Sequence, residues 1–223
     1  MGVLKNLFAI FQDQREVLDL SSFGDELALK ASWDPLVSGG TNFCTHELQK
    51  SNSLPSKGLL CFKTTFASIL FSGIFIIVGL VAFINSISLG EPQAILISLG
   101  FIGGGFWLWR MMKRKESVFD YSSQSLTMGG KTYNLNQICA IQLIREYVRG
   151  NKSSYYSYEL NLVCSNGERI NIVDHGSLRV IRNDADQLAD YLSVPVWDAI
   201  DFRIPEQVAD WDAKSEVLRE NIG

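Results

Sequence analysis

Residues 64–90, TTFASILFSGIFIIVGLVAFINSISLG, contain no charged side chain, and they decide which kind of fold this chain adopts. A helix needs about 20 apolar residues to cross the hydrocarbon core of a bilayer, and about 17 are the lower limit. A second uncharged run, residues 93–109, follows directly after Glu91 and Pro92. Both runs are therefore long enough to span a membrane.

The two runs predict a transmembrane helical hairpin over residues 59–112, with helices at 64–86 and 92–110. A buried helical hairpin in a soluble protein is the alternative. Such helices carry a polar face, however, and rarely lack charge over this length.

Charges at the ends of the hairpin predict its orientation. The link between the two runs contains no Lys or Arg, whereas the second run ends in WLWRMMKRK, residues 107–115. By the positive-inside rule, this end and both chain termini face the cytoplasm. Aromatic and basic side chains favour the headgroup layer. The expected interface anchors are Trp107, Trp109, Arg110, Lys113, Arg114 and Lys115.

Small residues recur inside both spans. Gly100 and Gly104 form a GxxxG step, and Ser68 and Ser72 form a similar step in the first span. Such spacing lets helix backbones approach closely in lipid. We expect these residues to pack the hairpin, and contact between two copies of the chain is the alternative. No charge lies in the middle of either span, so we expect an anchor rather than a transporter.

The overall composition narrows the partners and cofactors. The 20 basic residues against 24 acidic ones argue against nucleic acid, since duplex binding needs a strong basic excess. The four cysteines form no CxxC pair, and a cytoplasmic location argues against stable disulfides. Cys44 and His46 supply only half of a metal site, and His175 is the only other histidine. We expect no metal and no cofactor.

The two ends of the chain predict accessory segments. Residues 1–58 are expected to be a cytoplasmic segment that begins with an amphipathic helix, which lies either on the membrane or against the protein itself. The apolar residues of this helix are Val3, Leu4, Leu7, Phe8 and Phe11. Residues 201–223 predict an acidic tail, either a helical extension or a partner-binding peptide.

Short strands and turns over residues 116–200 predict a small cytoplasmic β-domain. Asn166-Gly167 lies between two alternating segments and predicts a hairpin with a type I′ turn. On the first arm of this hairpin, alternate residues predict one face toward the core. These residues are Tyr156, Tyr158, Leu160, Leu162 and Cys164.

A helix is predicted after the strands, with Ser177 as its N-cap and Pro195 beyond its end. Its apolar stripe consists of Leu178, Ile181, Ala185, Leu188, Ala189 and Leu192. Antiparallel strands followed by one helix are the order of a pleckstrin-homology-like domain. The predicted fold class is therefore an α+β membrane protein, with a two-helix transmembrane hairpin and a small antiparallel β-domain closed by a C-terminal helix.

Two polar segments invite a functional interpretation. Asp174, His175 and Ser177 are too close in sequence to converge as a catalytic triad, so we expect them to shape a turn, with Gly176 supplying backbone freedom. We expect no catalytic residues. A second segment predicts a loop whose role stays open between a solvated turn, a protein contact and an anionic-lipid contact. Its residues are Arg149, Asn151, Lys152, Ser153 and Ser154.

Four segments carry a resemblance: SWDPLVSGGTNFCTH, EYVRGNKSSYYSYELNLV, RINIVDHGS and VPVWDAI, at residues 32–46, 146–163, 169–177 and 194–200. With them, the chain resembles an uncharacterised family of bacterial membrane proteins in which two transmembrane helices precede a cytoplasmic β-domain. The order of elements is also similar to that of a photosystem I assembly factor of chloroplasts and cyanobacteria, in architecture alone. The resemblance implies a location in the bacterial inner membrane and no particular activity.

These observations favour a non-enzymatic scaffold or interaction subunit that presents its β-domain to a protein partner at the membrane. An anionic-lipid-sensing module is the second hypothesis, and a membrane-bound enzyme is the third.

Overall fold

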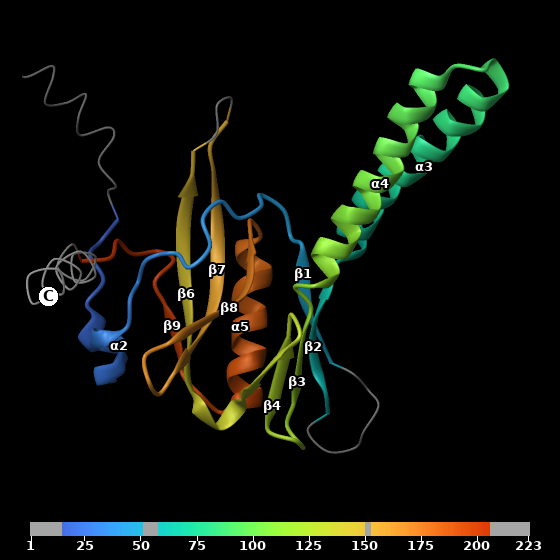
Figure 1. Ribbon diagram of the computed structural model, residues 1–223. Coiled ribbons are helices and arrows are strands. Elements are labelled where there is room, and N and C mark those ends of the chain that lie inside the picture. The colour runs from blue at the N-terminus through green and yellow to red at the C-terminus, as the bar shows by residue number, and fades with distance from the viewer. Residues whose placement is uncertain (1–14, 51–57, 150–152, 206–223) are drawn as a thin grey trace, which may run out of the picture.

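The computed structural model describes residues 15–50, 58–149 and 153–205 (Figure 1). It shows an α+β fold with two apolar helices and two open sheets, one antiparallel and one mixed. The apolar residues of the expected N-terminal amphipathic helix, together with Asn151, Lys152 and most of the expected acidic tail, lie outside the described residues.

The two apolar helices, α3 (Phe66–Leu89) and α4 (Pro92–Lys113), are 24 and 22 residues long. The helix α3 begins where the side chain of Thr65 accepts a hydrogen bond from Ser68 N, and it ends at Gly90, whose φ of 69° is left-handed. The helices form an antiparallel pair that projects away from the sheets (Figure 1). Both are long and apolar enough to cross a membrane, in agreement with the predicted spans.

The first sheet is a five-stranded antiparallel meander in the order β1-β2-β3-β4-β5. Its strands are β1 (His46–Lys50), β2 (Leu60–Thr64), β3 (Ser117–Asp120), β4 (Ser125–Met128) and β5 (Lys131–Asn134). The strand β2 leads into α3 and β3 follows α4, and the two strands pair directly, with Phe62 opposite Ser117. The helical hairpin is therefore inserted between two neighbouring strands. The predicted boundaries at 58 and 116 are wrong, because residues on both sides of the hairpin build one sheet.

The second sheet has the order β8-β7-β6-β9. Its strands are β6 (Ile138–Val148), β7 (Tyr155–Cys164), β8 (Arg169–His175) and β9 (Val196–Asp198). The strand β9 runs parallel to β6, so this sheet is mixed rather than antiparallel. The predicted helix is confirmed as α5 (Leu178–Leu192), which packs against β6, β7 and β1 between the two sheets (Figure 1).

Two local predictions within the second sheet are wrong. Gly167 has a φ of 84°, but Asn166 has a negative φ, so the β7–β8 connection is not a type I′ turn. Gly167 N instead bonds Cys164 O at 2.8 Å, which makes a three-residue loop that ends in a left-handed glycine. Tyr156 is 43% exposed and lies outside the core, although Leu160 and Leu162 on the same face are fully buried.

The other face of the second sheet is buried by the N-terminal segment. The turn η1 (Leu20–Phe23) and the short helix α2 (Glu26–Lys30) lie over β6, β7 and β9. The rings of Phe23 and Trp33 stack 5.5 Å apart, and both contact Trp197. The N-terminal segment therefore covers this second face of the sheet with hydrophobic residues, and the sequence pattern did not reveal this second core.

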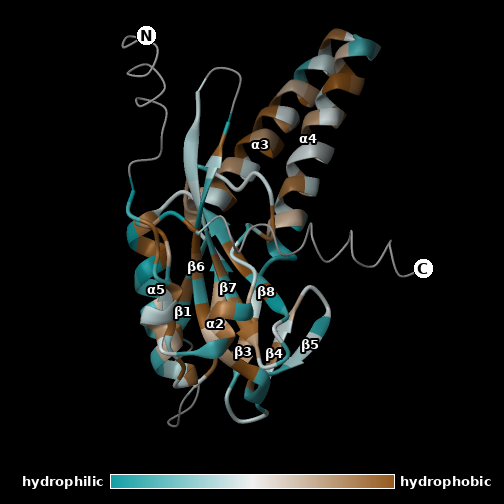
Figure 2. Ribbon diagram, turned by 90° about the vertical axis from the view of Figure 1, so that its left-hand side faces the viewer, coloured by the Kyte–Doolittle hydropathy of each residue, from teal (hydrophilic) through white to brown (hydrophobic). Residues whose placement is uncertain are grey.

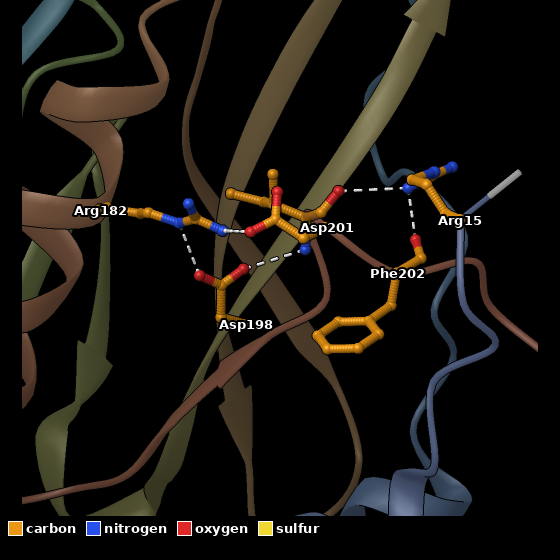
Figure 3. A network of polar contacts seen from close by, with 6 residues as sticks. Arg15, Arg182, Asp198, Asp201 and Phe202 are labelled. Atoms are coloured by element: carbon orange, nitrogen blue, oxygen red, sulfur yellow. Dashed lines mark hydrogen bonds and ion pairs between the residues drawn. The ribbon is translucent and has the colours of Figure 1, made fainter.

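The chain after β9 also belongs to the folded body (Figure 3). Arg182 of α5 pairs with Asp198 at 2.7 Å and with Asp201 at 2.6 Å, and Arg15 donates to the carbonyl oxygen of Phe202. Leu18 N bonds Arg203 O at 2.9 Å. The predicted end of the domain at residue 200 is therefore too early.

Candidate functional site

The most concentrated group of buried polar residues lies where the second sheet meets the base of the helical hairpin. Residues 33–45, called the strap here, cross this region over β6 and β7. Glu159 is fully buried, and its carboxylate accepts hydrogen bonds from Leu36 N at 2.9 Å and Val37 N at 2.7 Å. Glu146 accepts from Gly39 N at 3.0 Å. Two carboxylates on the strands thus accept hydrogen bonds from backbone N–H groups of the strap. Such bonds to a carboxylate are charge-assisted and stronger than those between neutral groups.

Glycine permits the closest approaches of the strap to the sheet. A Cβ atom at Gly40 would overlap the side-chain oxygens of Asp174 and Ser157. A Cβ atom at Gly176 would lie 2.5 Å from the carbonyl oxygen of Asn42. Gly176 has no left-handed backbone, so its expected role as a flexible turn residue is wrong, and its role is close packing.

Cys44 and His175 meet at the end of the strap, with Sγ and Nε2 3.7 Å apart. His175 Nδ1 accepts a hydrogen bond from Ser177 N, so the proton of the neutral ring is on Nε2, facing the thiol. Burial lowers the pKa of His175 to about 4, and burial raises the pKa of Cys44 to about 11. The histidine is therefore a donor toward a protonated thiol, which is the reverse of what a nucleophilic cysteine needs.

His46 joins the strand β1 to the end of α4. Its Nε2 donates to Met112 O at 3.0 Å, and its Nδ1 accepts from Thr45 Oγ1 at 3.0 Å. Burial lowers the pKa of His46, so the neutral ring that this pattern requires is favoured. Among the described residues, no three His, Cys, Asp or Glu side chains are placed to hold a metal ion.

The base of α3 is bonded to the end of the strap as well. Thr65 N donates to Thr45 O at 2.9 Å, and Thr65 Oγ1 donates to Cys44 O at 2.9 Å. Ser68 Oγ donates to Thr45 O at 3.3 Å, so one of the predicted packing residues serves this junction. Both helices are therefore tied to the strap or to β1 through short-range polar contacts.

Two buried carboxyl groups complete the region. Burial raises the pKa of Asp174 to about 6, partly offset by the hydrogen bond from Ser157. Burial likewise raises the pKa of Asp184 to about 6, and Leu48 N donates to its carboxylate at 3.1 Å. Asp184 lies on the core stripe of α5, where the sequence predicted only apolar residues. Its position four residues before Leu188 was the signal that could have placed it there.

The packing of the helical hairpin uses different glycines from those predicted. A Cβ atom at Gly79 would lie 2.7 Å from Ile102, and one at Gly105 would lie 2.7 Å from Ile76. A Cβ atom added at Gly100 or Gly104 would meet no atom of the described residues within 4 Å, so these two glycines do not pack the hairpin. They lie in an outward-facing apolar groove of about 440 Å³ with Phe75, Phe101 and Trp107.

Small residues every seven positions mark the true interface. Ser72, Gly79 and Ser86 of α3, and Ser98 and Gly105 of α4, are all buried. A seven-residue repeat keeps one helix face against its neighbour, as in a left-handed pair. In this hairpin the four-residue GxxxG step does not predict the helix–helix interface. This repeat is visible in the sequence and could have located the interface.

The predicted interface anchors lie together at the end of α4. Trp107 is 61% exposed, and Trp109 packs against Phe106 with ring centroids 5.5 Å apart. Arg110, Arg114 and Lys115 are exposed, whereas Lys113 pairs with Glu116 at 2.8 Å. Glu116 also accepts from Thr64 N, which links the basic end of α4 to β2.

The predicted contact loop lies at the far end of the β6–β7 hairpin. Arg149, Ser153 and Ser154 are exposed, and the structure does not bring them near Cys44, His175 or Asp174. Comparisons with protein-family models, with curated proteins and with solved structures find no match to this chain.

Proposed function

We propose that this protein is a non-enzymatic scaffold or interaction subunit, anchored in the bacterial inner membrane by α3 and α4, with both termini in the cytoplasm. In this role the sheets and α5 present a surface to a protein partner. The large apolar side chains on the outer faces of both helices support membrane insertion, since so large an exposed apolar area is unfavourable in water. They include Phe66, Ile77, Ile84, Leu96 and Trp107.

The insertion of the helical hairpin between paired strands is the observation that carries this proposal. Only Thr65 separates β2 from α3, and only Arg114, Lys115 and Glu116 separate α4 from β3. The strap adds direct hydrogen bonds to the base of α3. An anchor joined in this way holds a bound partner at a fixed height and orientation relative to the bilayer.

The order of two antiparallel β-units followed by α5 also supports a pleckstrin-homology-like classification, which we keep as part of the proposal. The open edges and the parallel strand β9 are departures from a closed form. The buried groups of the junction support a structural role rather than catalysis. Glu159, for example, uses both carboxylate oxygens on amides of the chain itself.

Reporter fusions test the orientation. Alkaline phosphatase fused after Gly90 is expected to be active, because it is exported, and green fluorescent protein fused to the C-terminus is expected to fluoresce. The reverse pattern would contradict the proposed topology.

Photo-crosslinking in cells tests the scaffold role. A photoreactive amino acid at Ser123 or Ser165, which are exposed turn positions of the β-domain, is expected to capture the same protein from the cytoplasm. The matched control is Leu96, an exposed position on α4, which is expected to give no such adduct. Absence of a common adduct from a full set of exposed β-domain positions would overturn the proposal.

A further inference from the structure

The outer end of the β6–β7 hairpin extends beyond the helix that covers the rest of its inner face. Leu143 and Leu160 are fully buried in the core that α5 completes. Four residues further out on the same face, Tyr147 and Tyr156 are 54% and 43% exposed. Figures 1 and 2 show that this end of the hairpin extends past α5 at the same end of the sheets from which α3 and α4 project.

Strand pairing shows which way this face points. Tyr158 pairs with Arg145 on β6 and with His175 on β8, and directly paired residues project to the same side of a sheet. His175 meets Cys44, whose carbonyl oxygen accepts the hydroxyl of Thr65 at the start of α3. The face that carries the exposed tyrosines is therefore the one that meets the base of the helical hairpin.

Arg145, Tyr147 and Tyr156, called the tyrosine patch here, have the chemistry of a membrane interface. The two tyrosines pair across the strands with ring centroids 5.3 Å apart, and the guanidinium carbon of Arg145 lies 4.2 Å from the ring centroid of Tyr156. Tyrosine is enriched at the headgroup level because it combines an apolar ring with a polar end. Arginine matches phosphate with several donors at once.

The charge around the patch has one sign. Within the described residues, neither Arg145 nor Arg149 has a carboxylate within ion-pair distance. Arg145 Nε is buried and has no hydrogen-bond partner there. The neighbouring acid, Glu146, points to the opposite face, where its carboxylate accepts from Gly39 N. Among the described residues, an anionic surface would therefore meet two arginines and no carboxylate on this face of β6 and β7.

We propose that the tyrosine patch rests on the anionic headgroup layer of the same bilayer that α3 and α4 span, with Arg149 beside it. The inference depends on the membrane anchor proposed above. It gives the scaffold a second contact with the membrane, in addition to the basic end of α4 at Arg110, Arg114 and Lys115. Two separate contacts fix the tilt of the β-domain on the bilayer.

Fluorescence quenching of the full chain in lipid vesicles tests the contact. A coumarin amino acid replaces Tyr147 in one sample and Ser165 in the other, since Ser165 is exposed at the opposite end of β7. The vesicles contain phosphatidylcholine and phosphatidylglycerol, with a nitroxide-headgroup lipid as the quencher. Quenching is expected at position 147 and not at position 165, and it is expected to weaken without phosphatidylglycerol.

Charge-neutral variants provide the matched comparison. Arg149→Gln is expected to lower the equilibrium constant for docking of the β6–β7 end on the headgroup layer by up to about fivefold. This factor corresponds to the loss of one basic side chain near an anionic surface. Lys30→Gln removes the same charge from an exposed position on α2 and is expected to have no effect. Circular dichroism of each variant checks that the fold is retained.

The outcomes separate this proposal from the anchor on which it depends. If alkaline carbonate releases the chain from the vesicles, the membrane anchor and the lipid contact are both wrong. If the chain is retained but position 147 is not quenched, or is quenched no more than position 165, the lipid contact alone is overturned. Equal effects of Arg149→Gln and Lys30→Gln would also contradict it.

Discussion

The carboxylate of Glu159 accepts the backbone N–H of Val37 at 2.7 Å, across 122 residues of sequence. It joins a central strand of one sheet to the strap that leads into β1 of the other. Between these two residues the chain crosses the whole helical hairpin. A buried carboxylate that satisfies two strap amides therefore helps to hold together the strap, the sheets and the anchor.

Glu159→Gln is expected to lower the free energy of unfolding by about 1–3 kcal/mol. The amide group of glutamine places a second donor against Leu36 N or Val37 N, and a buried donor without an acceptor costs about 1–3 kcal/mol. Thermal unfolding in detergent, followed by circular dichroism, measures the change. Glu26→Gln, at an exposed ion pair, is the control and is expected to change little. Equal stabilities of the two variants would show that the strap is not held in this way.

Gly105→Ala is expected to destabilise the helical hairpin, whereas Gly104→Ala is not. The added methyl at Gly105 meets Ile76 at 2.7 Å and Ser72 O at 2.9 Å, and overpacking of this kind costs about 1–3 kcal/mol. At Gly104 the methyl group meets no atom within 4 Å in the part of the chain that the structure describes, and the better helix propensity of alanine contributes up to about 1 kcal/mol. Unfolding in mixed micelles compares the two. A loss of equal size at Gly104 would contradict this helix interface.

Gly104 also tests contact between copies of the chain. Gly100 and Gly104 lie in an outward groove, so self-association through this groove would weaken in Gly104→Leu without loss of hairpin stability. Light scattering in detergent measures the association state. An unchanged state in the variant would remove this groove as an oligomer contact.

Asp184→Asn is expected to raise stability at neutral pH and to change its pH dependence. The carboxyl group has a pKa of about 6 in the fold against 3.8 unfolded, so its favourable contribution is complete below pH 3.8 and is lost as the pH rises through about 6. The asparagine oxygen keeps the bond from Leu48 N and carries no charge. We expect a gain of about 2 kcal/mol at neutral pH that disappears toward pH 4.

The contribution of His175 to stability changes with pH in the direction opposite to that of Asp184. Its pKa is about 4 in the fold against 6.5 unfolded, so its contribution is present above pH 6.5 and is lost as the pH falls toward 4. The test of Asp184→Asn therefore uses the difference in the free energy of unfolding between the variant and the parent protein at each pH. The contribution of His175 is the same in both proteins and cancels in this difference. A difference that does not vary with pH would contradict the raised pKa of Asp184.

Gly176→Ala is expected to destabilise the fold, whereas Ser177→Ala is nearly neutral. The methyl group at Gly176 overlaps the backbone of Asn42 in the strap, and both backbones are fixed by neighbouring bonds. Ser177 occupies the N-cap position of α5, but its side chain makes no capping hydrogen bond. The usual loss of about 1 kcal/mol for removing a cap is therefore not expected. Thermal unfolding of both variants checks the contrast, and a larger loss in Ser177→Ala would reverse it.

Local composition was sufficient to predict three helices of this protein, α3, α4 and α5. The absence of charge over residues 64–90 and 93–109 depends on no distant contact, and it predicted α3 and α4 directly. The apolar stripe of α5 is equally local, since residues three and four apart share one face of a helix. Exposure of Arg110 and Trp107 at the end of α4 follows from their position alone.

The arrangement of these elements was decided by contacts between segments far apart in the chain. The pairing of β2 with β3 spans the hairpin, and the burial of Glu159 depends on a strap more than a hundred residues away. Strand alternation indicated one buried face of β7, but only the N-terminal segment explains why Ser157, Glu159 and Asn161 are buried on the other. The pattern of polar and apolar side chains along the sequence indicates which environment each residue prefers. Which segment supplies that environment depends on the packing of the whole chain, because close-packed contacts form between surfaces and not along the sequence.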